Sequence, residues 1–135
     1  MSLPVLIFRF LGIAMLLAAV VGFNFAVWGL RRHPEPRNID VSLADAERGR
    51  LLVRSYGCGS CHQVPGVPNA SGRVGPNLAQ LRERTFVAGV LPTSGPSVAA
   101  WIRDPQTIRP GSAMPDLNVS ERDARDMAAY LLSLP

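Results

Sequence analysis

The sequence predicts an all-α domain that follows a single membrane-spanning helix. Three observations support this prediction: an apolar run near the amino terminus, stretches with apolar residues at helical spacing towards both ends of the remaining chain, and no convincing parallel-sheet strands. At 135 residues the chain is long enough for one core beside such a helix. We therefore expect an uncleaved membrane anchor at residues 1–32, a proline-containing linker at 33–42 and a globular domain at 43–135.

The apolar run from Phe10 to Leu30 contains 21 residues, of which Asn24 is the only strongly polar one. At about 1.5 Å per residue, a helix of this length crosses the roughly 30 Å hydrocarbon layer of a bilayer. A cleavable secretory signal is the competing interpretation. The run is longer than the apolar part of such signals, and no clear small-x-small cleavage site follows it. We therefore expect a retained single-pass anchor in the lipid bilayer.

The net charge of +4 arises from arginine alone, since the chain contains no lysine. Residues 39–135 carry ten arginines against nine acidic residues, so the basic excess lies next to the apolar run, at Arg9, Arg31, Arg32 and Arg37. This distribution indicates charge at a membrane surface and no nucleic-acid-binding patch. Taken alone, the positive-inside tendency would place the carboxyl side of the span in the cytoplasm.

The globular domain is expected to open with a helix. Ser42 is a hydroxyl N-cap, and Asp45 and Glu47 then stand in the first turn, where the helix dipole favours acidic residues. Residues at three- and four-residue spacing form one face of this helix: Gly49, Leu52, Val53 and Tyr56. Gly57 allows the chain to leave the helix.

Both cysteines of the chain lie in one motif, Cys58-Gly59-Ser60-Cys61-His62. Cys-x-x-Cys-His is the attachment signal for a c-type haem, in which two thiols bind the porphyrin and the histidine coordinates the iron. A thioredoxin-like redox pair would need alternating strands and helices, a zinc site would need two more ligands, and a disulfide would leave His62 unexplained. We therefore expect one covalent haem c, with thioethers at Cys58 and Cys61 and His62 as an axial ligand.

The chain after this motif is rich in proline and glycine and is expected to be mostly loop. Within it, Phe86 and Leu91 are expected to cover haem edges. Ser97 is expected to cap a short helix that Asp104-Pro105 stops. A capping sequence at Ser120 then begins the last helix, which is expected to extend to Leu134.

The segment 49–53, leading into 56–62, resembles the amino-terminal helix and haem site of class I cytochromes c. The similarity covers about residues 43–135. It implies the class I cytochrome c fold, in which the first and last helices cross. In this sequence we expect the crossing near Gly49, with small Ala128 or Ala129 opposite.

The resemblance also implies roles for residues around the haem. Residues 75–78 are similar to a family segment whose proline carbonyl accepts a hydrogen bond from the proximal histidine, which implies that Pro76 orients His62. Leu78 then lines the haem, and Trp101 matches a family position that packs near it. An ordinary Gly-Pro turn at Pro76 and plain core packing of Trp101 are the alternatives.

Of the four methionines, Met114 alone occupies a loop of the globular domain. Pro110 and Pro115 bracket it and restrict its backbone, whereas Met127 stands at helical spacing with apolar residues of the last helix. The stretch around Met114 is also similar to the distal-ligand motif of class I cytochromes c. We therefore expect His62 and Met114 to be the two axial ligands of the iron, with a gap-filling methionine as the alternative.

With both axial positions filled, the iron has no vacant site for a substrate, so the sequence predicts an electron carrier and not an enzyme. The pattern resembles small cytochromes that accompany haem–copper oxidases, which implies such an oxidase as partner, with this protein as its electron donor or one of its subunits. A quinol-oxidising complex or a periplasmic dehydrogenase is the alternative. The competing class is a haem enzyme or gas sensor in which Met114 is displaceable, but no histidine beyond His62 offers a distal acid–base pair.

The same resemblance decides the expected orientation, because bacterial cytochromes of this kind acquire haem outside the cytoplasmic membrane. This consideration outweighs the arginine count. We therefore expect the protein in the bacterial cytoplasmic membrane, with the amino terminus inside and the haem domain on the periplasmic side.

Overall fold

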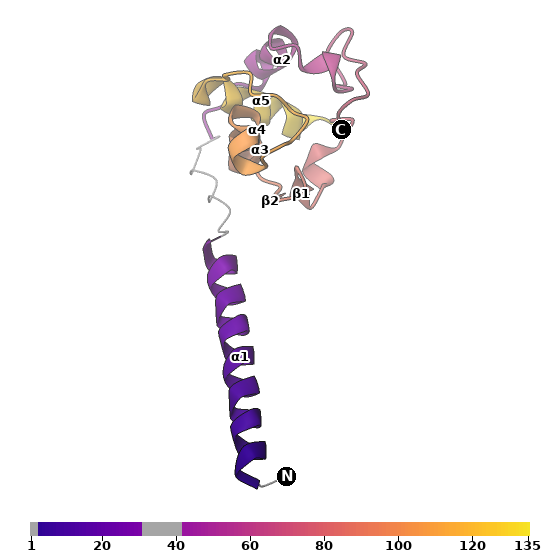
Figure 1. The fold of residues 1–135 in the computed structure, drawn as a ribbon. Coiled ribbons are helices and arrows are strands. Elements are labelled where there is room, and N and C mark those ends of the chain that lie inside the picture. Colours follow the sequence, from indigo (N-terminus) through magenta and orange to yellow (C-terminus); the bar gives the residue numbers. More distant parts are fainter. Residues whose placement is uncertain (1–2, 31–41) are drawn as a thin grey trace. The chain divides into compact units, whose positions relative to one another are not determined.

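The amino-terminal part of the chain is one long helix. The computed structural model describes residues 3–30 and 42–135, with side chains described for 11–27 and 42–135. The chain divides into two compact units, Met1–Glu35 and Pro36–Pro135, and the first contains the 28-residue helix α1 (Leu3–Leu30; Figure 1). Within the residues that the structure describes in full, no helix is long and apolar enough to cross a membrane. The predicted linker, apart from Ser42, lies outside the described residues.

The regular structure of the second unit is mainly helical, as predicted, and its elements lie on both sides of the Cys-x-x-Cys-His motif. In chain order they are α2 (Ala46–Ser55), η1 (Cys58–Ser60), η2 (Leu81–Glu83), β1 (Phe86–Val87), β2 (Leu91–Pro92), α3 (Gly95–Arg103), α4 (Pro105–Ile108) and α5 (Glu121–Ser133). Strands β1 and β2 form a small antiparallel hairpin that the sequence did not predict. Its turn places Ala88 and Gly89 at positive φ, and an alanine there gives no turn signal.

Two helices begin at residues other than those expected. Asp45, and not Ser42, caps α2, because its carboxylate accepts a hydrogen bond from the Arg48 N–H at 2.9 Å. Ser94, and not Ser97, caps α3, and its hydroxyl oxygen accepts the Ser97 N–H at 3.2 Å. The helix can start this early because Pro96, near its first position, lacks an N–H that would need a partner.

Asp104-Pro105 ends α3 as predicted, but it also starts another helix. Asp104 is the C-cap of α3 and the N-cap of α4, and its carboxylate accepts the Thr107 N–H at 3.1 Å. Proline suits the first turn of a helix, so Pro105 begins α4 and is itself buried. Ser120 caps α5 as expected, by accepting the Asp123 N–H at 3.2 Å.

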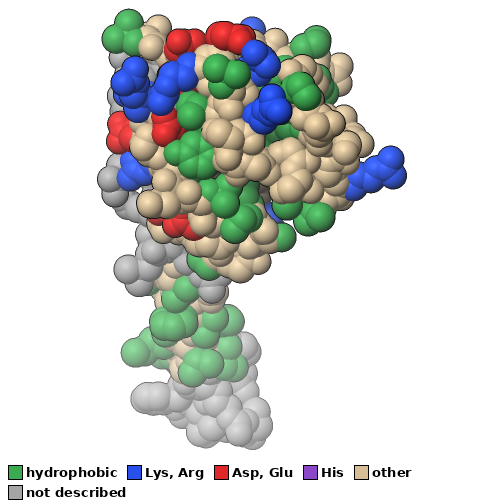
Figure 2. Space-filling model, turned by 90° about the horizontal axis from the view of Figure 1, so that it is seen from above, with side chains coloured by type: hydrophobic (Ala, Val, Ile, Leu, Met, Phe, Trp, Pro, Cys, Tyr) green, Lys and Arg blue, Asp and Glu red, His purple; other side chains and the backbone are tan. Residues whose placement is uncertain are grey.

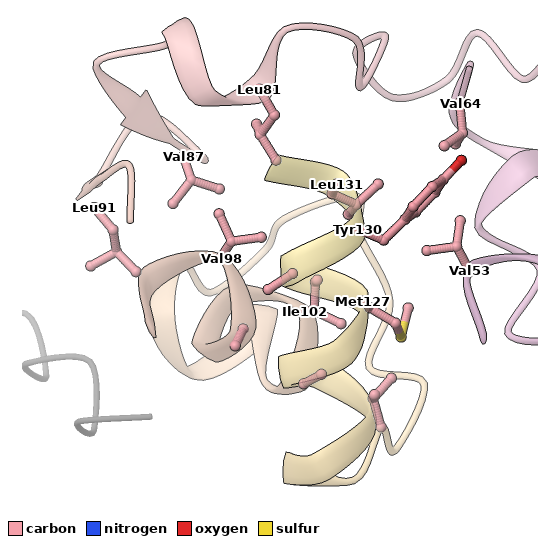
Figure 3. Packing of buried hydrophobic residues seen from close by; sticks show 14 of the residues in the cluster. Val53, Val64, Leu81, Val87, Leu91, Val98, Ile102, Met127, Tyr130 and Leu131 are labelled. Carbon is pink, nitrogen blue, oxygen red and sulfur yellow. The ribbon is translucent and has the colours of Figure 1, made fainter. Parts of the chain in front are cut away.

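The core of this unit lies where α2, α3 and α5 pack together (Figure 1). Figure 3 shows side chains from these helices converging, with α5 between the residues of α2 and those of α3. The buried residues of the three helices include Val53, Val98, Ala99, Ile102, Ala124, Met127, Ala128, Tyr130 and Leu131. Met127 therefore belongs to the core, as its helical spacing predicted.

Helices α2 and α5 cross at Gly49, as expected from the resemblance. A Cβ atom at Gly49 would lie 2.5 Å from the carbonyl carbon of Asp126 and 3.0 Å from the nitrogen of Met127. The residues opposite are thus the backbone of Asp126 and Met127, and not Ala128 or Ala129 as predicted. Close backbone approach makes glycine necessary here, which accounts for a residue that is otherwise unfavourable inside a helix.

A polar network joins the same two helices beside the crossing. Arg48 forms ion pairs with Asp123 and Asp126, and the Tyr56 hydroxyl donates to Asp123 at 2.9 Å. Asp126 is only 5% exposed, and it also accepts the N–H of Asp45 at 2.9 Å. Burial by itself would raise the pKa of Asp123, but hydrogen bonds from Tyr56 and Arg48 outweigh it and hold that pKa below its usual range.

Charged side chains on the globular unit are mixed in sign. On the face shown in Figure 2, blue basic and red acidic side chains lie beside one another, with hydrophobic side chains over the centre. Ion pairs of this unit include Arg50 with Glu47 at 2.6 Å and Arg103 with Glu121 at 3.1 Å. This face therefore carries no broad surface of a single sign.

Candidate cofactor site

The globular unit encloses a cavity of about 750 Å³ that opens to solvent. Residues from η1, η2, β1, α3, α5 and the loops between them line it, together with Tyr56 at the end of α2. Every site residue predicted from the sequence is among them: Cys58, Cys61, His62, Pro76, Leu78, Trp101 and Met114. The fold thus brings together, around one space, residues that are up to 56 positions apart in the chain (114 − 58).

The two thiols come from a tight turn that follows α2. Gly57 adopts φ +72° and ends the helix, and η1 then begins at Cys58. The carbonyl of Cys58 accepts hydrogen bonds from the N–H groups of Cys61, at 3.2 Å, and His62, at 3.0 Å. No disulfide joins Cys58 and Cys61 in the structure.

The imidazole of His62 is held in one orientation. Its Nδ1 lies 2.7 Å from the carbonyl oxygen of Pro76. A carbonyl can only accept, so Nδ1 must carry the proton and Nε2 must present its lone pair. This is the hydrogen bond that the resemblance implied for Pro76, and it prepares Nε2 to bind a metal ion.

Gly75 supports the same imidazole from close by. A Cβ atom at Gly75 would lie 2.5 Å from Nδ1 and 2.8 Å from Nε2 of His62, nearer than real Cβ atoms approach other atoms. The Gly75 N–H also donates to the carbonyl of Cys61 at 2.8 Å. From the sequence, Gly75 was expected only as one of the glycines in a loop-rich stretch. Its position one residue before the predicted histidine partner was the available signal for a close contact.

Met114 occupies a loop that one side chain of α4 binds at three points. The Gln106 amide nitrogen donates to the carbonyls of Ser112, at 2.9 Å, and Met114, at 2.7 Å. The Gln106 amide oxygen accepts the Gly111 N–H at 3.1 Å. Inside the loop, the Ser112 hydroxyl accepts the Met114 N–H at 3.2 Å. Sequence reasoning missed Gln106, because it did not predict α4.

The remaining walls of the cavity are largely apolar. Trp101 and Leu78 line it as expected, and the core residue Met127 also reaches it. Of the two residues expected to cover haem edges, Phe86 lines the cavity and is 52% exposed, whereas Leu91 is 3% exposed and is not part of the lining. Leu91 is wrong as a cavity residue because it pairs with Val87 in the hairpin and packs in the core.

The chemistry of these residues fits a haem. The cavity offers the two thiols, an imidazole nitrogen with its lone pair exposed, a thioether sulfur and apolar walls. Nitrogen and sulfur donors are the axial ligands of haem iron in electron-transfer proteins, and a flat apolar macrocycle needs apolar walls. Glycine at position 75 leaves room for the imidazole of His62, which a Cβ atom there would overlap.

Comparison with known proteins leads to the same cofactor. Residues 46–135 match the family profile described as Cytochrome c. The cytochrome c oxidase subunit 2 of Alkalihalophilus pseudofirmus is 38% identical over 90 residues, which cover 66% of this chain and 25% of that protein. The subunit 2 of Bacillus subtilis is 42% identical over 87 residues, which cover 58% of this chain and 24% of that protein. The chain therefore spans about a quarter of the length of these relatives.

The family profile covers two thirds of the chain and includes every residue of the cavity. Membership of this family implies covalently attached haem c, and Cys58 and Cys61 fit its attachment motif. It also makes electron transfer the role of the globular unit, as the sequence predicted. The chain belongs to the cytochrome c family.

Proposed function

We propose that the protein is a membrane-anchored cytochrome c whose single haem is ligated by His62 and Met114 and which delivers electrons to a haem–copper oxidase. The observation that carries this proposal is the placement of Cys58, Cys61, His62 and Met114 around one largely apolar cavity. The haem, when attached, supplies one-electron exchange between ferric and ferrous iron.

On the histidine side, the chain sets both the protonation and the direction of the ligand. Pro76 fixes the tautomer of His62 through its hydrogen bond to Nδ1, and this bond raises the donor strength of Nε2. On the other side, the thioether of Met114 is neutral and stabilises ferric iron poorly. We therefore expect a reduction potential above that of a cytochrome with two histidine ligands.

Exposed apolar side chains border the cavity and are suited to a partner that approaches the haem edge. Val74 is 77% exposed, Phe86 52% and Leu117 38%, and all three belong to the cavity lining. Apolar contacts of this kind exclude water without requiring a permanent complex. The proposed partner is a haem–copper oxidase, because the related proteins are named cytochrome c oxidase subunit 2.

The proposed anchor is the segment Phe10–Leu30, whose run of apolar residues in the sequence is long enough to span a bilayer. With the amino terminus in the cytoplasm, the haem domain lies on the periplasmic side. A tethered domain meets partners in the same membrane at an effective concentration that reaches about millimolar. Weak contacts at the cavity mouth are then sufficient for repeated electron transfer.

Ligation is tested by replacing methionines one at a time in the full-length, haem-loaded protein. Met114→Leu removes the proposed sulfur ligand, and Met15→Leu, on the exposed surface of α1, is the matched control. We expect Met114→Leu to lose the sulfur-to-iron charge-transfer absorption, to bind carbon monoxide when reduced and to change its potential. Met15→Leu should do none of these. If Met114→Leu retains the sulfur absorption, the proposed ligation is wrong.

Partner and anchoring are tested in membranes. We expect the wild-type protein to sediment with membranes and to copurify with oxidase activity after mild solubilisation. A variant in which residues 1–32 are replaced by a cleavable secretory signal should become soluble in the periplasm while retaining its haem. If the copurified fraction lacks oxidase activity, the proposed partner is wrong, whereas the proposed haem ligation is unaffected.

A further inference from the structure

Helix α4 carries a side chain whose hydrogen bonds are all directed at the loop that contains Met114. Gln106 makes three hydrogen bonds, to Gly111, Ser112 and Met114, with lengths between 2.7 and 3.1 Å. Both ends of the amide are used, the nitrogen as a double donor and the oxygen as an acceptor. Neither a hydrocarbon nor a carboxylate of the same length can make this set.

We propose that Gln106 is the positioning residue for Met114, which holds the methionine where its sulfur reaches the haem iron. The proposal rests on the His62 and Met114 ligation proposed above. Gln106 does not line the cavity, so it acts through the backbone of the loop. Its bond to the Met114 carbonyl, at 2.7 Å, is the shortest of the three and fixes the residue that bears the ligand.

Helix α4, which carries Gln106, is itself held in place. Asp104 caps α4, and the flanking residues Pro105 and Ile108 are buried in the core. The other hydrogen bonds of the loop are mostly internal, such as Ser112 N–H to the Arg109 carbonyl at 3.1 Å. An internal bond shapes the loop but does not attach it to the rest of the domain.

One other side chain also attaches this region. The guanidinium of Arg109 donates to the carbonyl of Ala88 in the hairpin turn at 3.0 Å. This contact holds the start of the loop, five residues before Met114 (114 − 109). Gln106 contacts Met114 itself, so its loss is expected to free the ligand while the start of the loop remains attached.

A loop that is free to move lets other ligands compete for the iron. If Gln106 holds Met114 in place, its replacement must raise the affinity of ferric iron for added imidazole and of ferrous iron for carbon monoxide. We expect Gln106→Leu, which removes all three hydrogen bonds, to raise the imidazole association constant on the order of tenfold or more.

A second variant separates positioning from packing. Gln106→Glu has nearly the same shape and keeps the acceptor for Gly111, but it replaces the double donor by a carboxylate that faces two carbonyl oxygens. Positioning predicts that Gln106→Glu exchanges Met114 at least as readily as Gln106→Leu. A packing role predicts that Gln106→Glu behaves like the wild type.

The experiment uses the full-length, haem-loaded protein and the two variants, with Thr107→Ala as a matched control. Thr107 neighbours Gln106 in α4, and its side chain is exposed. The measurements are imidazole titration of the ferric form, carbon monoxide binding by the ferrous form and the sulfur-to-iron absorption. Haem content and thermal unfolding report whether each variant has folded.

The outcomes distinguish this inference from the proposal on which it rests. If the wild type shows the sulfur absorption and both variants bind imidazole as weakly as Thr107→Ala, Gln106 is not a positioning residue. The same conclusion holds if only Gln106→Leu is affected. If the wild type itself lacks the sulfur absorption, Met114 is not the ligand and both proposals are wrong. Weakened absorption and tighter imidazole binding in both variants support the inference.

Discussion

The two sides of the haem cavity are built by different means. The segment that carries His62 is fixed by backbone hydrogen bonds and by glycines that lie against other atoms. A Cβ at Gly59 would lie 2.7 Å from the Ala70 side chain, and one at Gly75 would overlap the imidazole of His62. The loop that carries Met114 has open space around Gly111, where a Cβ would meet nothing within 4 Å. That loop depends on a side chain, Gln106.

This difference predicts how the segment that carries His62 and the loop that carries Met114 respond to substitution. A backbone held by close contacts cannot move without disrupting its neighbours, so His62 and the two cysteines stay together as one unit. A loop held by one amide can be released by a single substitution while the core remains intact. We therefore expect changes on the histidine side to affect folding and haem content, and changes on the methionine side to affect ligation.

Matched glycine substitutions on the two sides should give the largest contrast in stability. Gly75→Ala forces a methyl group into the His62 ring and is expected to cost about 3 kcal/mol, since it combines overpacking with the loss of a hydrogen bond. Gly111→Ala has room for the methyl group and should cost only about 1–2 kcal/mol, from its φ of +79°. Denaturant unfolding and haem content measure both.

Equal costs for the two variants would show that the histidine side is no more rigid than the methionine side. A full haem content in Gly75→Ala, together with unchanged stability, would also contradict the close contact between Gly75 and the imidazole.

The sequence predicted the residues that bear chemistry better than the residues that support them. Cys58, Cys61 and His62 form a local motif, so their roles follow from spacing alone. Met114 was distinguishable because prolines surround it. Gln106 could not be distinguished in this way. Its hydrogen bonds to a loop several residues away depend on tertiary structure, which no local pattern encodes.

The same dependence on tertiary structure explains the errors in the predicted helix cap, the residues opposite Gly49 and the cavity lining. Ser42 and Asp45 are both acceptable caps, and the choice depends on where the helix begins; Asp45 caps it by accepting the Arg48 N–H three residues later. The crossing at Gly49 followed from the resemblance, but the residues opposite depend on the exact rotation of α5, which apolar spacing gives only approximately. Leu91 was assigned to the cavity because its neighbours are apolar with no clear period.

The network that holds α2 against α5 also bears on the histidine side, because Tyr56 lies two residues before Cys58. Tyr56→Phe removes the donor to Asp123 and should cost about 1 kcal/mol at neutral pH. The lowered pKa of Asp123 means that its contacts stabilise the fold above the unfolded pKa, near 4, and lose this effect as pH falls through the folded value. The loss in free energy of unfolding caused by Tyr56→Phe should therefore become smaller at acidic pH.

Tyr130→Phe is the matched control for this pH dependence. The Tyr130 hydroxyl donates to the carbonyl of Pro65 at 2.6 Å, a group that does not titrate. The loss in free energy of unfolding caused by Tyr130→Phe should be similar to that of Tyr56→Phe at neutral pH, and it should persist as the pH falls below about 4. Thermal unfolding of the three proteins between neutral and acidic pH makes the comparison. Parallel deficits at every pH would show that Asp123 is not coupled to Tyr56.

The smallest effect is expected at Pro76, although its carbonyl lies within hydrogen-bond distance of the His62 imidazole. Its contribution to His62 is a backbone carbonyl, which Pro76→Ala retains, so the hydrogen bond at 2.7 Å should survive. The variant loses only the stiffness that proline gives to the unfolded chain, worth about 0.4–1 kcal/mol. We expect full haem content and a potential close to that of the wild type. A large shift of the potential in Pro76→Ala would mean that the ring of the proline, and not its carbonyl, determines the orientation of His62.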